Sequence, residues 1–161
     1  MKVLNVHKRC FDLPKVMVAN ALATLSSTED QLWPKDRWPA MSFPEGIQVG
    51  ARGGHGPIRY IVEDHNPNQI IQFRFSKPRG FNGIHKFEIF DQGETQTMLI
   101  HTIQMTTTGK STFLWLFGIR ALHNALIEDG FDNLENRLLN KKLRTPWNFW
   151  VRFLRKQLAK R

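Results

Sequence analysis

The 161-residue sequence has an ordinary hydrophobic content of 41%, one cysteine and a net charge of +9. This length predicts one domain with enough chain to bury a core. The single Cys10 excludes an internal disulfide and favours a reducing compartment, so we expect a cytoplasmic protein. The sequence starts with no signal-peptide pattern, and its longest near-continuous apolar run, residues 113–119, is too short to span a bilayer.

The positive charge is concentrated at the C-terminal end. Residues 141–161 carry eight basic residues and no acidic one, whereas residues 1–140 carry 15 basic and 14 acidic residues. The body is therefore electrically balanced and gives no reason to expect a nucleic-acid partner. We predict a ligand-binding domain over residues 1–140 and a basic amphipathic extension over residues 141–161.

The N-terminal part of the chain predicts a strand followed by two helices. Residues 3–11 alternate as in a strand. Asp12 is the expected N-cap of a helix that has Pro14 in its first turn and ends near Leu25. Residues 26–30, with sequence SSTED, predict the start of a second short helix, which two later Trp-Pro pairs end. Two helices here would cap one end of a curved sheet.

Residues 50–108 contain strand-like runs with a period of two, separated by turn residues. An odd-length loop after residue 91 would place the most apolar faces of the last two strands together, whereas a two-residue loop would separate their histidines. We favour the odd loop. It puts four residues on one face: His85, Phe87, Leu99 and His101.

A long helix is predicted to begin at Ser111. Its apolar stripe keeps helical spacing and can lie across the mouth of the sheet. The stripe consists of Trp115 or Leu116, Ile119, Leu122 or His123, Leu126, Gly130, Leu134 and Leu138. Residues 113–117, FLWLF, are apolar all round, so they form either a cavity gate or membrane-touching lip, or a surface packed against other elements.

The order strand, two short helices, antiparallel meander and long helix resembles the SRPBCC superfamily, the START-like, helix-grip group. The motifs that carry the resemblance are WPKDRWP, GARGGHGPIRY, GFNGIHKFEI and IRALHNALIEDGFDNLE, over about residues 3–140. The resemblance implies an α+β helix-grip fold, in which a curved antiparallel sheet of six or seven strands wraps around the long C-terminal helix and an apolar cavity. Members range from lipid carriers to polyketide cyclases, so it implies no single activity.

We predict that an apolar or amphipathic ligand, lipid-, polyketide- or quinone-like, binds between sheet and helix. His85 and His101 are the catalytic candidates, as acid and base of a cyclase or dehydratase; the alternative is two satisfied core histidines. The predicted ligand-binding residues are Arg59, Phe73, Phe75, His85, Phe87, Leu99, His101, Ile103, Ile119, His123 and Leu126.

The glycine-rich segment around Arg52 and His55 superficially resembles a phosphate-binding loop. Phosphate loops open a helix, whereas this one precedes a strand, so we favour a bulge or sharp turn into the sheet. With Arg59, these two side chains could still meet a polar ligand head at the cavity rim. No metal-binding or cofactor motif is present in the sequence, and we expect neither a metal site nor a cofactor.

The extension has its own pattern, starting with Pro146 as a first-turn residue of a helix. Aromatic and aliphatic residues share one side of this helix and basic residues fill the rest, a pattern typical of interfacial membrane helices. Docking on the body and binding of another partner are the alternatives. The residues predicted to contact an anionic membrane or a partner are Trp147, Trp150, Arg152, Leu154, Arg155 and Lys156. The sequence does not indicate an oligomeric state.

Overall fold

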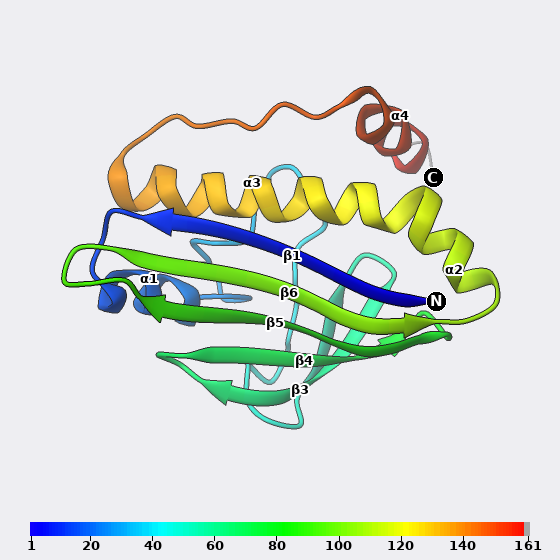
Figure 1. The fold of residues 1–161 in the computed structure, drawn as a ribbon, viewed down its shortest axis with the longest axis horizontal. Coiled ribbons are helices and arrows are strands. Elements are labelled where there is room, and N and C mark those ends of the chain that lie inside the picture. The colour runs from blue at the N-terminus through cyan, green and yellow to red at the C-terminus, as the bar shows by residue number, and fades with distance from the viewer. Residues whose placement is uncertain (160–161) are drawn as a thin grey trace.

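Alternating apolar and polar residues build a six-stranded antiparallel sheet in the computed structural model, which describes residues 1–159 (Figure 1). The strand order is β1-β6-β5-β4-β3-β2, so the first strand pairs with the last and β2 forms the far edge. The strands are β1 Lys2–Phe11, β2 Arg52–His55, β3 Ile58–Asn66, β4 Ile70–Lys77, β5 Phe81–Asp91 and β6 Thr97–Thr107. The predicted α+β class is confirmed, with six strands.

The register of β5 and β6 confirms the odd-length loop. Asp91 pairs with Thr97, which leaves a five-residue connection. Phe87 then lies opposite His101, and His85 lies opposite Ile103. Because side chains alternate across a strand, both histidines point to the same concave face of the sheet.

One continuous helix lies along this face (Figure 1). It consists of α2 (Lys110–Leu114), a π-helical segment η1 (Trp115–Ile119) and α3 (Arg120–Leu139). The helix starts one residue before the expected Ser111, after Gly109. Asn140 ends it in a left-handed conformation.

The region after β1 holds one helix, α1 (Lys15–Ala23), where two were expected. Asp12 does not cap it, because its carboxylate accepts a hydrogen bond from the Gln96 side chain on the β5–β6 loop (2.8 Å). The predicted second helix at residues 26–30 is wrong. There, the Asp30 carboxylate accepts three bonds from nearby backbone N–H groups and holds the segment in turns instead.

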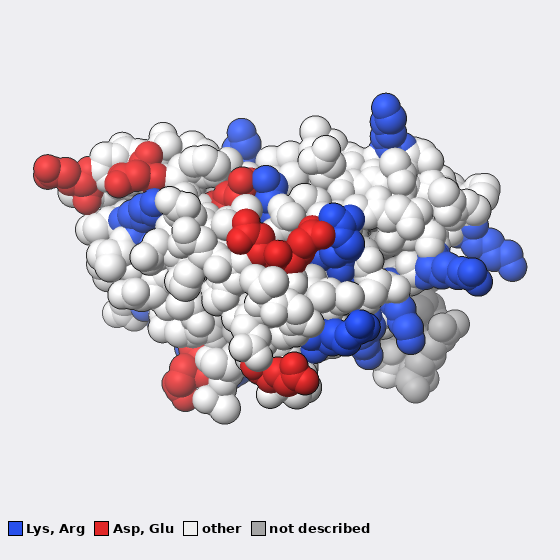
Figure 2. Space-filling view, turned by 90° about the horizontal axis from the view of Figure 1, so that it is seen from below, with Lys and Arg blue, Asp and Glu red and all other residues white. Residues whose placement is uncertain are grey.

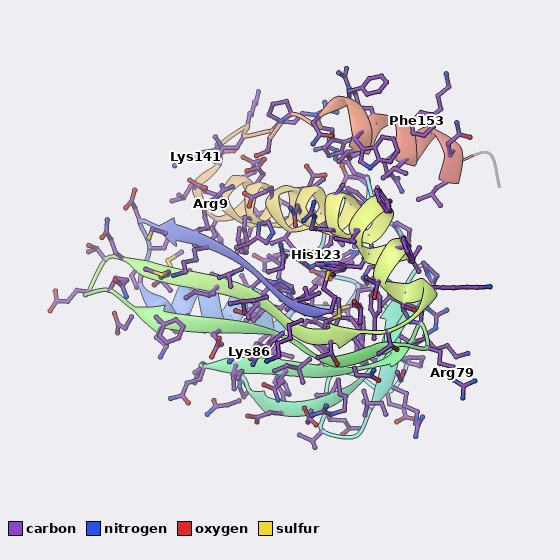
Figure 3. The ribbon with its side chains drawn as sticks, turned by 45° about the vertical axis from the view of Figure 1, so that its right-hand side comes forward. Arg9, Arg79, Lys86, His123, Lys141 and Phe153 are labelled. Atoms are coloured by element: carbon purple, nitrogen blue, oxygen red, sulfur yellow. The ribbon has the colours of Figure 1, made fainter. Side chains whose placement is uncertain are left out.

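The two ends of the molecule differ in packing. At the end that holds α1, large side chains such as Phe11, Leu22 and Phe131 are fully buried against one another. On the outer side of this end, Arg9 of β1 donates to three carboxylates on successive turns of α3 (3.0–3.1 Å), which ties the first strand to the last long helix (Figure 3). The bonded carboxylates are those of Glu128, Asp132 and Glu135. The opposite end, under η1, is hollow.

After α3 the chain runs back along the helix and ends in α4 (Phe149–Leu158), beside the α2 end (Figure 1). The helix starts later than Pro146, because the Asn148 side chain caps it by accepting from the Val151 backbone N–H (2.9 Å). In this structure α4 is docked on the body: Val151 is buried, and the Trp147 indole donates to Asp129 of α3 (2.9 Å).

Candidate ligand-binding site

A cavity of about 380 Å³ lies between the sheet and the helical segments η1 and α3. Trp33 and Trp38, from the loop after α1, close one side, and Leu154 and Leu158 of α4 stand at its mouth. Its lining is almost entirely apolar. Pockets of about 300–1,000 Å³ with such walls are the usual size for small-molecule sites.

Most of the predicted ligand-binding residues line this cavity. They are Phe75, His85, Phe87, His101, Ile103, Ile119, His123 and Leu126. The alternation of the strands and the helical stripe thus located both walls. Leu154 and Arg155, predicted as membrane or partner contacts, also line it, because α4 folds back over the mouth.

Three predicted residues do not line the cavity. Phe73 and Leu99 are fully buried in the core, and the Phe73 ring stacks against His85 at 4.7 Å, so that it supports the imidazole from the side. The Arg59 guanidinium is bonded to the carbonyls of Gly56 and Ile58 in its own hairpin. The short hairpin also confirms that the glycine-rich segment turns into the sheet, since β2 pairs with β3 there.

A row of polar aromatic rings crosses the cavity wall, with one member each from β2, β3, β5, β6 and α3. Successive ring centroids along it are 5.9, 4.5, 5.7 and 4.9 Å apart. The row consists of His55, Tyr60, His85, His101 and His123, and all five line the cavity. Figure 3 shows His123 between α3 and the sheet. We name these five residues the polar row.

The polar row contains buried atoms that have no hydrogen-bond partner among the described residues. They are Tyr60 Oη, His85 Nε2, His101 Nδ1 and His123 Nδ1. More than about 90% of buried polar groups in folded proteins are satisfied, and one left unpaired costs about 1–3 kcal/mol. Four such atoms around one cavity therefore mark a place where partners from outside the chain, water or a ligand, can bind.

The histidines of the polar row are uncharged at neutral pH. Burial lowers the pKa of His123 to about 3 and that of His55 to about 4. Burial, and then the neighbouring imidazoles, lower the pKa of His85 and His101 well below 6.5. Burial also raises the pKa of Tyr60 well above 10. Each neutral imidazole offers one donor and one acceptor, so the row can bind hydrogen-bonding groups without presenting a charge.

The cavity offers limited catalytic chemistry. No carboxylate, hydroxyl nucleophile or thiol belongs to the described lining apart from the Tyr60 phenol. Within residues 1–159, no group of three or more His, Cys, Asp or Glu side chains is placed to hold a metal ion. Acid–base chemistry here would depend on the imidazoles and the Tyr60 phenol, and the cyclase or dehydratase alternative stays a prediction.

Outside the mouth, α2, η1 and α4 expose large aromatic side chains. Phe113 stacks on Phe117, the Phe117 carbonyl accepts from the Trp150 indole (3.0 Å), and Trp150 stacks on Phe153. We name these four residues the aromatic patch. Phe113 and Phe117 are 66% and 63% exposed, so the FLWLF run divides: Trp115 turns into the interior and the phenylalanines face out.

Basic residues accompany the aromatic patch. Exposed Lys110, Arg152 and Lys156 belong to the same helices, and exposed Arg120 directly follows η1. No acidic residue occurs between Glu94 and Glu128. Figure 2, which views the sheet side, shows Lys and Arg but no Asp or Glu toward its right-hand end, the end where Figure 1 places α2 and α4. Arg79 projects from the β4–β5 loop at this end (Figure 3).

Comparison of the fold with solved structures identifies its class. A protein from Thermobifida fusca aligns with a TM-score of 0.64 at 10% identity, over 90% of this chain and 99% of that chain. A START superfamily protein from Mycobacterium smegmatis aligns with a TM-score of 0.57 at 12% identity, over 85% and 97%. Norcoclaurine synthase from Thalictrum flavum, solved with dopamine and hydroxybenzaldehyde, aligns with a TM-score of 0.63 at 9% identity, over 89% and 90%.

These neighbours confirm the predicted helix-grip fold, which this chain shares with a START superfamily protein and with norcoclaurine synthase. At such low identities the likeness does not transfer a ligand or a reaction. No protein-family model and no curated protein matches the sequence.

Proposed function

We propose that the protein binds an apolar or amphipathic small molecule in the cavity between the sheet and α3. The observation that carries this function is an apolar cavity of about 380 Å³ with a row of unpaired polar atoms from the sheet and α3. Apolar lining supplies affinity, and a few convergent polar groups fix orientation, as ligand sites generally require.

Binding of the neutral fluorescent probe N-phenyl-1-naphthylamine tests this proposal. Leu126→Trp places a bulky ring inside the cavity and should abolish the fluorescence increase. Leu4→Trp makes the same change on β1, where Leu4 is 72% exposed, and should leave binding unchanged. Equal binding by all three proteins would show that the probe reports only surface patches and would refute the proposal.

We propose, as a second function, that the aromatic patch brings the protein to an anionic membrane surface. Clusters of exposed aromatic residues on the surface mark interaction sites, and the flanking Lys and Arg select an anionic partner. Leu114 and Leu158 line the cavity and are themselves exposed, so the same surface surrounds the cavity mouth. Among residues 1–159 no helix has the length and hydropathy to cross a bilayer.

A vesicle experiment should change the aromatic patch without removing the tail, because Trp147 and Val151 pack on the body. We expect the wild type to sediment with vesicles of phosphatidylcholine and phosphatidylserine. Each basic residue contributes about 1 kcal/mol near such a surface, and high salt should remove that part only. Phe113→Ser with Phe117→Ser should abolish the salt-resistant part.

The matched control is Phe90→Ser on β5, since Phe90 is also exposed but lies at the end of its strand near the β5–β6 loop. Equal sedimentation of the double variant and the control would contradict the membrane function. Binding that high salt removes completely would show that the aromatic patch does not enter the bilayer.

A further inference from the structure

The polar groups of the cavity are gathered in the polar row, and this arrangement restricts the ligand. Adjacent rings, such as Tyr60 and His85 or His101 and His123, have centroids 4.5–4.9 Å apart. A single ligand oxygen between two such rings can lie within hydrogen-bonding distance of both. Apart from Arg155 and Gln157 of α4, the rest of the described lining is largely carbon, so the polar row is where most polar partners for a ligand lie.

The protonation states decide what kind of polar group fits. Because burial keeps the histidines neutral, the polar row mixes donors and acceptors and has no fixed charge. Among the described residues that line the cavity, the charged one is Arg155. Its buried Nε has no partner in the described chain, but its contacts, over Trp38 and Trp147 and to the Arg37 carbonyl, lie outside the polar row. A carboxylate or an ammonium would therefore be buried beside the polar row without a counter-ion. A hydroxyl is neutral, donates and accepts, and matches the row.

The shape and chemistry of the walls favour a flat ring next to that hydroxyl. The ring centroids of Phe75 and His85 are 5.0 Å apart, and those of Phe87 and His101 are 4.5 Å apart. Trp115 lines the cavity on the helix side. Aromatic rings pack well on such surfaces in edge-to-face and offset geometries. Since an apolar cavity of about 150 Å³ holds one benzene, the 380 Å³ here accommodate about two fused or linked rings.

We propose that the cavity binds an uncharged hydroxyaryl compound, a phenol or hydroquinone, with its hydroxyl on Tyr60, His85 and His101 and its ring against Phe75 and Phe87. The inference rests on the proposed binding function and names its ligand class.

Four probes of similar size separate the features of this ligand in wild-type protein. The reference probe is 2-naphthol. Naphthalene lacks its hydroxyl, 2-decalol lacks its aromatic rings, and 2-naphthoate carries a negative charge in place of the hydroxyl. Isothermal titration calorimetry at pH 7 should give 2-naphthol at least about a tenfold affinity advantage over naphthalene, because a site built for a hydroxyl rejects the analogue that lacks it. 2-Decalol and 2-naphthoate should bind more weakly than 2-naphthol.

Variants then locate the recognition. Tyr60→Phe and His101→Phe keep ring size and should each weaken 2-naphthol binding about fivefold, the effect of one hydrogen bond, while naphthalene affinity stays the same. His65→Phe, at a half-buried position near the end of β3 and outside the cavity lining, is the matched control and should change neither affinity. Circular dichroism melting verifies folding, and if His101→Phe fails to fold, the near-isosteric Tyr60→Phe decides.

Equal affinities for naphthalene and 2-naphthol would overturn the hydroxyl preference, while the apolar binding function would stand. Tighter binding of 2-decalol would overturn the aryl preference, and tighter binding of 2-naphthoate would overturn the uncharged class. Failure of all four probes and of N-phenyl-1-naphthylamine to bind would instead refute the proposed function itself.

Discussion

Two polar side chains on α3, the partly buried His123 and the buried Asp129, have opposite surroundings. The Asp129 carboxylate accepts from the indoles of Trp38 (2.6 Å) and Trp147 (2.9 Å) and from the Arg37 guanidinium, three donors from two distant segments. His123 Nδ1 is equally enclosed and has no partner among the described residues.

The difference separates polar groups that hold the fold from polar groups that are available to a ligand. The satisfied carboxylate joins α3 to the loop after α1 and to the segment before α4, so it fixes the roof of the cavity. Four polar atoms of the polar row lack hydrogen-bond partners in the described chain, and its histidines remain uncharged beside the cavity. Each side of this comparison predicts a different response to perturbation.

The largest expected effect is loss of stability in acid. The pKa values of all four histidines of the polar row are lowered in the folded state, so below pH 6.5 the unfolded chain binds more protons and stability falls as the pH falls. At pH 5 each histidine costs up to about 2 kcal/mol relative to pH 7, or up to about 8 kcal/mol together. Urea denaturation between pH 7 and 5 measures this, and His101→Phe should reduce the slope by about a quarter. If the free energy of unfolding does not change between pH 7 and 5, the imidazoles can be protonated in the folded protein.

Asp129→Ala should have the next largest effect. Removing the carboxylate leaves the Arg37 charge and two indole N–H groups without their acceptor, which should lower the free energy of unfolding at pH 7 by about 3–4 kcal/mol. Asp129→Asn retains one acceptor oxygen and should lose less. Urea denaturation gives the energies, and limited trypsin digestion at Arg144 reports whether the tail detaches. If Asp129→Ala lowers the free energy of unfolding by less than about 1 kcal/mol, Asp129 does not stabilise the fold more than the residues of the polar row do.

The smallest expected effect is that of His101→Phe on the ligand-free protein at pH 7. Because His101 Nδ1 has no partner in the described chain, the free energy of unfolding should change by less than about 1 kcal/mol. The same urea experiment measures it. A loss of about 2 kcal/mol or more would place His101 with the satisfied groups and would weaken its assignment to a ligand.

Much of the site could be predicted from the sequence because the spacing of apolar residues matches the regular spacing of side chains along strands and helices. Side chains alternate strictly along β5 and β6, so one assumption about loop length put His85, Phe87 and His101 on a common face. The same alternation over Ile58, Tyr60 and Val62 also indicates that Tyr60 points inward, although Tyr60 is not among the predicted ligand-binding residues.

The missed features depend on particular hydrogen bonds, some between close neighbours in the sequence and some between separate segments. Asp30 lies in a sequence typical of a helix start, yet its carboxylate binds the N–H groups of Leu32 and Trp33 and stabilises turns. The docking of α4 depends on the bond between Trp147 and Asp129, which no local pattern encodes. For the same reason, the hydrophobic periodicity of the tail fitted a membrane and the body of the protein equally well.

The π-helical segment η1 sets the rotational phase of the helix on either side of it. A π turn contains an extra residue, and each residue of an α-helix advances the side chain by about 100°. Deleting one residue within positions 115–119 would restore a regular α-helix and rotate everything before it by that angle relative to α3. The ring centroids of Trp115 and Phe81 are 6.1 Å apart in the interior. After the deletion Trp115 would leave the interior, and Phe113 would turn with it. One inserted residue thus decides which side chains of FLWLF form the cavity wall and which face outward.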